Sequence, residues 1–159
     1  MKRTLILWCA LVAGTCWPAS LPAAPPDAHR TVLITPLRLY AAADVAFLNH
    51  GILEMLATRL PQQGRIQVKQ WNRSPVDEAE AMVLAQEQEA DFILLGSVVI
   101  FDGNVSTDAR LLNAATGEVV LRFSRFGRSP GDVLYHVDLL AREIAAAIDP
   151  KASPAKKEG

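Results

Sequence analysis

The chain has 159 residues, half of them hydrophobic, with 16 basic against 17 acidic residues and a formal net charge of −1. This length suffices for one domain with a real core, and the lack of a basic cluster argues against nucleic-acid binding. Both cysteines, Cys9 and Cys16, lie near the N-terminus, which excludes thiol catalysis, thiolate metal sites and disulfides from the rest of the chain.

The first 23 residues have the pattern of a secretory signal peptide. Lys2 and Arg3 precede an apolar run from Leu5 to Val12, which is too short to span a bilayer as a helix. Small residues follow at 21–24, and we expect cleavage after Ala23 and a periplasmic protein. Loss of the leader leaves 14 basic against 17 acidic residues, a net charge of −3.

The N-terminal segment has a second interpretation. Residues 13–16 (AGTC) resemble a bacterial lipoprotein cleavage site, in which Cys16 would be the acylated residue of an outer-membrane lipoprotein. In that case alone we expect contact with a membrane; otherwise Cys16 is removed with the leader.

The segment after the leader begins with an extended linker at 24–30, because Pro25 and Pro26 disfavour helix. A short buried strand is expected at 31–35 and a loop of small residues at 40–43. Asp44 is expected to cap a helix that reaches about Leu60. Its apolar positions recur at helical spacing and predict one buried face, formed by Leu48, Ile52, Met55, Leu56 and Leu60. Gly51 within this helix predicts close packing against a neighbouring backbone.

A strand over 65–71 alternates through Ile66 and Val68. Ser74 and Pro75 predict the start of a second helix, with Ser as N-cap and Pro in the first turn. The expected buried stripe of this helix comprises Ala79, Met82, Val83, Gln86 and Ala90.

Residues 90–125 predict three consecutive antiparallel strands. Asp102-Gly103 and Thr116-Gly117 mark tight turns, where glycine supplies a positive φ. The nearly unbroken apolar run 92–100 is typical of a strand buried on both faces. Residues 105–111 alternate apolar and polar side chains, which predicts a strand with one solvent-exposed face.

The last helix is expected to begin at Ser129-Pro130 and to end before Pro150, followed by a disordered tail at 150–159. Its expected buried residues are Val133, Leu134, Val137, Leu140, Ala141, Ile144 and Ile148. The predicted order is β-α-β-α-β-β-β-α. We therefore expect a single α/β domain at 31–149, with three helices on a mixed sheet of about five strands.

Four segments carry a resemblance to a known family: VLITPL (32–37), FLNHGILEMLATRL (47–60), EADFILLGSVVIFDGNVSTDARLLNAATGE (89–118) and LLAREIAAAI (139–148). They resemble the exported α/β domain at the front of TolB. Related domains occur in the flagellar lipoprotein FlgO, the penicillin-binding-protein activator lipoproteins and the curli secretion lipoprotein CsgG. The resemblance implies this fold and an interaction role, without catalytic residues or cofactors to carry over. The chain ends after the last helix with no propeller, which favours a stand-alone module over a TolB-type role.

Catalytic and metal-binding patterns are weak in this sequence. His29, His50 and His136 lack the short spacings of zinc ligands. His136 and Asp132 are four apart on a helix, which favours a surface hydrogen bond. Ser97 lacks the glycine-rich elbow of serine hydrolases. Asp102, Asn104 and Asp108 do not complete a calcium loop. We therefore expect no catalytic residue, metal or cofactor.

Cations and aromatics interleave at the end of the third strand of this unit. Arg122, Arg125 and Arg128 alternate with Phe123 and Phe126 in a frame that cannot bury both phenylalanines. Exposed Phe126 flanked by arginines would suit a partner's acidic groove or a glycan. The other interpretation is that Phe126 caps the core. Trp71 beside Arg73 is a weaker candidate of the same kind.

Two functions follow from these observations. The first is a periplasmic, non-catalytic accessory module that binds envelope proteins in transport, secretion, cell-wall synthesis or an appendage. The second is a small-ligand-binding protein or hydrolase that uses the carboxyl ends of strands 31–35 and 92–100, where α/β sheets commonly bind ligands.

Overall fold

The computed structural model describes residues 29–41 and 46–149. The expected leader with Cys16, most of the linker, the cap at Asp44 and the tail at 150–159 lie outside the described residues. The described elements, in chain order, are β1 (Arg30–Ile34), β2 (Arg38–Ala41), α1 (Ala46–Gln62), β3 (Ile66–Gln70), α2 (Glu78–Glu87), β4 (Phe92–Phe101), β5 (Asn104–Asn113), β6 (Val119–Gly127) and α3 (Asp132–Ile148).

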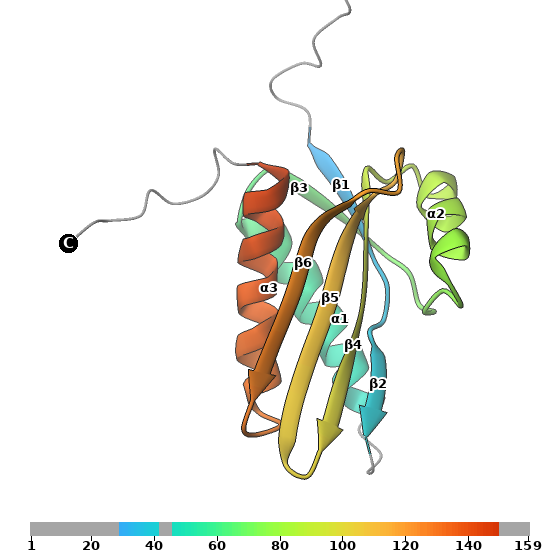
Figure 1. The fold of residues 1–159 in the computed structure, drawn as a ribbon. Coiled ribbons are helices and arrows are strands. Elements are labelled where there is room, and N and C mark those ends of the chain that lie inside the picture. Colours follow the sequence, from blue (N-terminus) through green and yellow to red (C-terminus); the bar gives the residue numbers. More distant parts are fainter. Residues whose placement is uncertain (1–28, 42–45, 150–159) are drawn as a thin grey trace, which may run out of the picture.

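The strands form one mixed sheet in the order β3-β1-β4-β5-β6, with β2 also paired to β4 (Figure 1). The β1–β3, β1–β4 and β2–β4 pairs are parallel, whereas β4–β5 and β5–β6 are antiparallel. The predicted α/β class, with three helices on a mixed sheet, is therefore confirmed.

Strand β2 was not expected, because a loop was predicted at 40–43, which overlaps the end of this strand. Of the ten residues of β4, only Phe92–Leu94 at its start pair with β1. After Pro36 the chain returns to the same edge, and Arg38–Ala41 pair with Ser97–Ile100. The short strands β1 and β2 thus pair one after the other with the same edge of the long strand β4, and Pro36 lies in the break between them.

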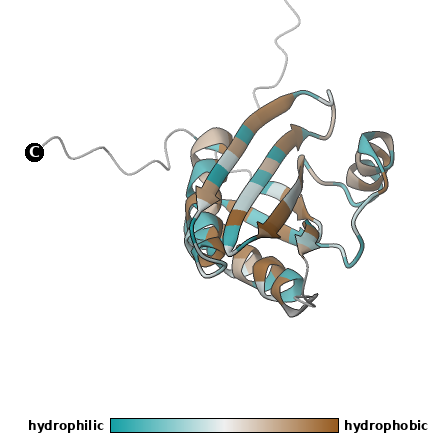
Figure 2. Ribbon diagram, turned by 60° about the horizontal axis from the view of Figure 1, so that its bottom comes forward, coloured by the Kyte–Doolittle hydropathy of each residue, from teal (hydrophilic) through white to brown (hydrophobic). Residues whose placement is uncertain are grey.

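Helices cover the two faces of the sheet unequally (Figure 1). α1 and α3 contact each other and close one face over the larger core, which includes Ile34, Leu56, Leu94 and Leu140. α2 lies on the other face over a smaller cluster around Leu33, Ile93 and Leu112. Apolar and polar residues alternate along the strands (Figure 2), which supplies the two different faces.

β4 is buried on both faces only in its first part. Ile93 belongs to the α2 cluster and Leu94 to the larger core, and both are fully buried. Further along, Val99 is partly exposed and Phe101 is largely exposed, because α2 does not reach this end (Figure 1). The expectation of two buried faces along the whole strand is therefore wrong for its second half.

The predicted start of α2 at Ser74-Pro75 is wrong. The helix begins at Glu78, where the Asp77 carboxylate caps it by accepting from the Glu80 N–H at 2.8 Å. The Ser74 hydroxyl instead donates to the Pro36 carbonyl across the β1–β2 break. The buried residues of α2 are Ala81, Leu84 and Ala85. The expected stripe is confirmed only for Ala90, which is buried beyond the helix end, and Met82, which packs against the same cluster, whereas Val83 is exposed.

α3 starts later than Ser129-Pro130 predicted, at Asp132. The Asp132 carboxylate accepts from the backbone N–H of Arg128 and of Ser129, at 2.8 and 3.1 Å, and so closes the turn from β6. The expected inward residues of α3 are confirmed except for Leu134, which is exposed.

Two expectations about packing are also wrong. Gly51 has open space around its Cα rather than a neighbouring backbone. His136 makes no surface hydrogen bond with Asp132; it is buried, and its Nδ1 lies 3.0 Å from the Thr107 hydroxyl. The turn glycines behave as expected, since Gly103 and Gly117 both have a φ of 73°.

Candidate functional site

The lower part of the sheet face that carries α2 is the candidate site (Figure 1). In neighbouring strands, residues that are register partners point to the same face, so the pairing assigns the side chains to rows. One row runs through Leu95, Arg110 and Arg122. The next runs through Arg38, Ser97, Asp108 and Ser124, and a third through Tyr40, Val99, Ser106 and Phe126. We call the surface formed by these rows the open face.

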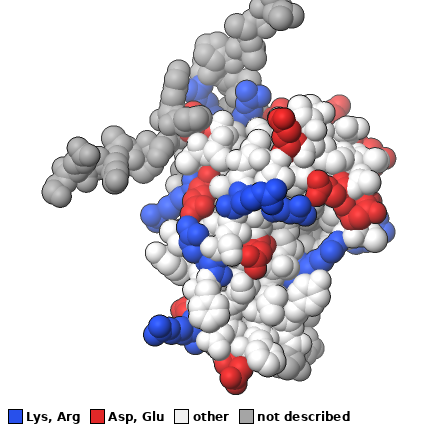
Figure 3. Space-filling view, viewed as in Figure 1, with Lys and Arg blue, Asp and Glu red and all other residues white. Residues whose placement is uncertain are grey.

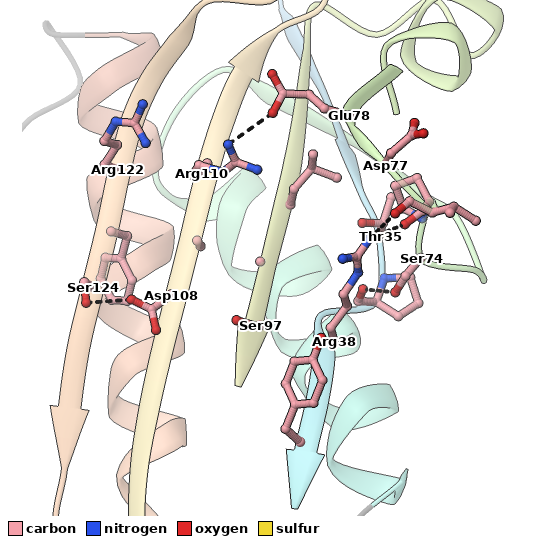
Figure 4. A pocket seen from close by; sticks show the side chains of 18 residues that line it. Thr35, Arg38, Ser74, Asp77, Glu78, Ser97, Asp108, Arg110, Arg122 and Ser124 are labelled. Carbon is pink, nitrogen blue, oxygen red and sulfur yellow. Dashed lines mark hydrogen bonds and ion pairs between the residues drawn. The ribbon is translucent and has the colours of Figure 1, made fainter. Parts of the chain in front are cut away.

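A cleft of about 650 Å³ lies between the open face and the segment that leads into α2 (Figure 4). Its floor is formed by β4, β5 and β6 around Gly96 and Asp108, and its wall by Ser74, Pro75 and Val76. Gly96 lies in this floor where the backbones of β4 and β5 approach closely: a Cβ on Gly96 would lie 2.4 Å from the Asp108 carbonyl oxygen.

Most polar side chains in the cleft are bonded to one another or to the backbone (Figure 4). Arg110 pairs with Glu78 of α2 at 3.1 Å. The Asp108 carboxylate accepts from Ser124 at 2.7 Å and from Ser106 at 3.1 Å. Arg38 donates to the Pro75 carbonyl at 2.8 Å and thereby fixes the wall to β2.

Arg122 is the exception. It is exposed, lines the cleft and forms no ion pair with any acidic side chain of the part of the chain that the structure describes. Its direct cross-strand partner is Arg110, and like charges in that position repel. No side chain of the described residues occupies its five N–H donors, which can therefore bind an anion from outside.

Below the charged rows lies an apolar patch, which we define as Tyr40, Val99, Phe101 and Phe126. The three aromatic residues are 55%, 76% and 68% exposed in that order, and Val99 is 38% exposed. Phe101 lies two residues beyond Val99 on β4 and so points to the same face. Figure 3 shows this division: charges gather on the upper part of the face, while the lower part is mostly uncharged.

The predicted partner residues do not form one cluster. Arg122 and Phe126 share the open face, but Arg125 lies on the other face of β6, where it pairs with Glu143 of α3 at 2.5 Å and stacks on the Phe123 ring at 4.9 Å. Arg128 is exposed in the turn after β6. Trp71 is half-buried against the α2 cluster. Phe126 does not cap the core, because it is largely exposed while Phe123 is buried.

Tyr40, Phe101 and the Asp108 row were missed by the sequence reasoning. Tyr40 fell in the expected loop, and Phe101 followed a run that predicted burial on both faces. The strand register could have identified them. The polar residues of β5 face solvent, and their register partners on β4 must therefore lie on the same solvent-exposed face.

The two carboxyl ends proposed for a ligand site are not brought together. Ile34 at the end of β1 pairs with Leu94, six residues before Ile100, a separation of about 20 Å along the strand. Thr35 and Pro36 border the cleft, whereas the end of β4 leads into the hairpin.

Within the described ranges 29–41 and 46–149, no group of three His, Cys, Asp or Glu side chains is placed to hold a metal ion. No helix among those same residues has the length and apolar character needed to cross a membrane.

Comparison with known proteins identifies the fold. No family model matches the sequence, and no curated protein matches it significantly. Among solved structures, the chain is similar to the PelC dodecamer from Paraburkholderia phytofirmans, with 20% identity, a TM-score of 0.52, and coverage of 79% of this chain and 93% of that one.

Two further structures have the same fold. Lipoprotein GNA1162 from Neisseria meningitidis is 18% identical with a TM-score of 0.50, covering 76% of this chain and 99% of that one. TolB from Acinetobacter baumannii is 14% identical with a TM-score of 0.50; the match covers 80% of this chain but only 29% of that one. The predicted resemblance to the TolB-type α/β domain is therefore confirmed at the level of the fold.

Proposed function

We propose that this chain is a non-catalytic interaction module of a bacterial cell-envelope assembly, and that it binds a partner protein through the open face. The observation that supports this most directly is the apolar patch of Tyr40, Val99, Phe101 and Phe126, which contributes nothing to either core. Exposed aromatics that gather on one face and are rimmed by charged residues are typical of protein–protein interfaces.

The chemistry of the cleft supports binding rather than catalysis. No histidine is among the described residues that line the cleft beside the hydroxyls of Ser97 and Ser124. His136 is buried, with its Nδ1 next to the Thr107 hydroxyl. Asp108 holds Ser124 and Ser106 in place through hydrogen bonds. A carboxylate is a weaker base toward a serine hydroxyl than the histidine of a catalytic triad, so these hydrogen bonds favour a structural role for Asp108.

The expected location rests on the leader at 1–23, and it agrees with one of the fold neighbours, GNA1162, which is a lipoprotein. The partner and the envelope process are not specified by the fold, because unrelated functions share one fold.

The test compares two single substitutions in the tagged full chain, expressed in the cells that produce it. Phe126→Ser removes an aromatic residue from the apolar patch, and the matched control Tyr135→Ser removes an equally exposed aromatic (64%) from α3 on the opposite side. We expect Phe126→Ser to reduce co-purification of a partner at least about tenfold with an unchanged melting temperature, while Tyr135→Ser has no effect. Equal recovery with both variants would contradict the proposal.

A further inference from the structure

The position of Arg122 defines the chemistry of the partner more closely; this inference rests on the proposed function above. Arg110 and Arg122 face each other directly across β5 and β6. Glu78 neutralises Arg110 from the α2 side, and both oxygens of Asp108 accept from serines. Arg122 therefore contributes repulsion without a compensating ion pair among residues 29–41 and 46–149, which is the arrangement expected where a carboxylate arrives from outside.

The apolar patch lies at a fixed distance from this guanidinium. Arg122 and Phe126 are four residues apart on β6 and face the same way, which separates their Cα atoms by about 13 Å. The row of Asp108 and Ser124 lies between them. A partner segment must therefore present an acid and an apolar side chain at matching separation.

The shape of the open face favours a helix as this segment. α1 and α3 cover the opposite face, whereas α2 covers only the upper part of this one (Figure 1). The uncovered part spans β2, β4, β5 and β6, about 14 Å at the usual strand spacing, and a helix is about 10–12 Å wide. On a helix, positions seven and eight residues apart share a face and lie about 10.5–12 Å apart along the axis, close to the separation of about 13 Å between Arg122 and Phe126.

We propose that the open face binds an amphipathic helix of a partner protein, with Arg122, assisted by Arg110, holding an acidic side chain of that helix while its apolar residues pack on the apolar patch. The pairing of a guanidinium with a carboxylate is bidentate and charge-assisted, which fixes the direction of the helix on the sheet. The Asp108 carboxylate in the intermediate row repels an acid placed one row lower and so sets the register.

The experiment uses the full chain in the cells that produce it, with a photo-crosslinking amino acid in place of Phe126 and, as control, in place of Tyr135. The crosslinked segment is sequenced by mass spectrometry. We expect it to be an amphipathic helical segment with Asp or Glu about seven or eight residues from the apolar residue that reacted.

The second arm adds Arg122→Glu to the Phe126 crosslinker. This reversal places opposite charges at the Arg110 pair, so the melting temperature is expected to stay level or rise, and lost crosslinking will not reflect unfolding. We expect crosslinking to fall at least about tenfold and to return when the partner's acid is changed to Lys. Arg128→Glu, which reverses an exposed arginine in the turn after β6, is the matched control and leaves crosslinking intact.

Each remaining outcome is informative. A protein crosslink that Arg122→Glu leaves unchanged, or a segment without an acid, overturns this inference while the proposed function stands. No protein crosslink above the Tyr135 control, or a crosslink to lipid or glycan alone, overturns both.

Discussion

His136 Nδ1 on α3 and Thr107 Oγ1 on β5 lie 3.0 Å apart, and both residues are almost completely buried. This hydrogen bond is the polar link between the last helix and the centre of the sheet. Desolvation by burial lowers the pKa of His136 below its usual 6.5; the nearby Asp132 carboxylate opposes this, and Arg125 adds to it.

The free energy of unfolding should therefore depend on pH. The unfolded chain takes up a proton at His136 near pH 6.5, before the folded chain does. The contribution of His136 to stability is therefore constant above that pH and falls as the pH drops toward the lowered folded pKa. We expect a lower melting temperature at pH 5 than at pH 7.5.

His136→Asn is the control for this effect, since an amide can keep the bond to Thr107 without titrating. Asp132 does not contribute to the same window, because hydrogen bonds from Arg128 and Ser129 lower its pKa from 3.8 and its own effect appears only near and below that pH. An equal pH slope in wild type and His136→Asn would remove His136 as the cause.

Leu94→Ala should destabilise the domain by about 2–5 kcal/mol through the cavity it leaves. Leu94 is fully buried between β4 and the layer of α1 and α3. Denaturant unfolding measures the loss, and a change below about 1 kcal/mol would mean that the core relaxes into the space.

Two glycine substitutions should change stability in opposite directions. Gly96→Ala forces a Cβ to within 2.4 Å of the Asp108 carbonyl oxygen, and we expect a loss of about 1–3 kcal/mol. Gly51→Ala fills open space on an exposed helix position, and we expect a gain of about 0.5–1 kcal/mol. Thermal unfolding of the two variants compares them, and the same sign for both would contradict the packing described above.

Arg125 and Phe126 should separate into a residue for the fold and a residue for binding. Arg125→Glu places an acid beside Glu143 and removes the stacking on Phe123, with an expected cost of about 1 kcal/mol. Phe126→Ser should change stability by less than about 0.5 kcal/mol but impair partner binding. Circular dichroism melting and co-purification of the two variants test this. A large loss of stability in Phe126→Ser alone would mean that Phe126 supports the core and would contradict its assignment to a binding surface.

The sequence was sufficient to predict those elements whose signals are local. Glycines 103 and 117 marked the turns, and the spacing of Ile52, Leu56 and Leu60 identified the buried side of α1. In α2 the small residues Ala79, Ala81 and Ala85 offered two competing faces, and the sheet decided between them.

The candidate site was predicted only in part, because it depends on pairing across the sheet. Arg122 and Phe126 were predicted to lie together, and they do. Arg125 was placed with them, but alternate residues of a strand face opposite sides, and Arg125 faces α3. Tyr40 joins the site only through the pairing of β2 with β4, and Arg38–Ala41 is too short a segment to predict that pairing from its own residues.

The most direct test of the open face as a binding surface is hydroxyl-radical footprinting of its aromatic side chains. The measurement is made once in the cells that produce the protein and once in the purified chain. We predict that Tyr40, Phe101 and Phe126 are oxidised several-fold more slowly in the cells than in the purified protein, whereas Tyr135, exposed on α3, reacts equally in both. Equal oxidation of all four residues in the two preparations would show that nothing covers the open face and would contradict its role in binding.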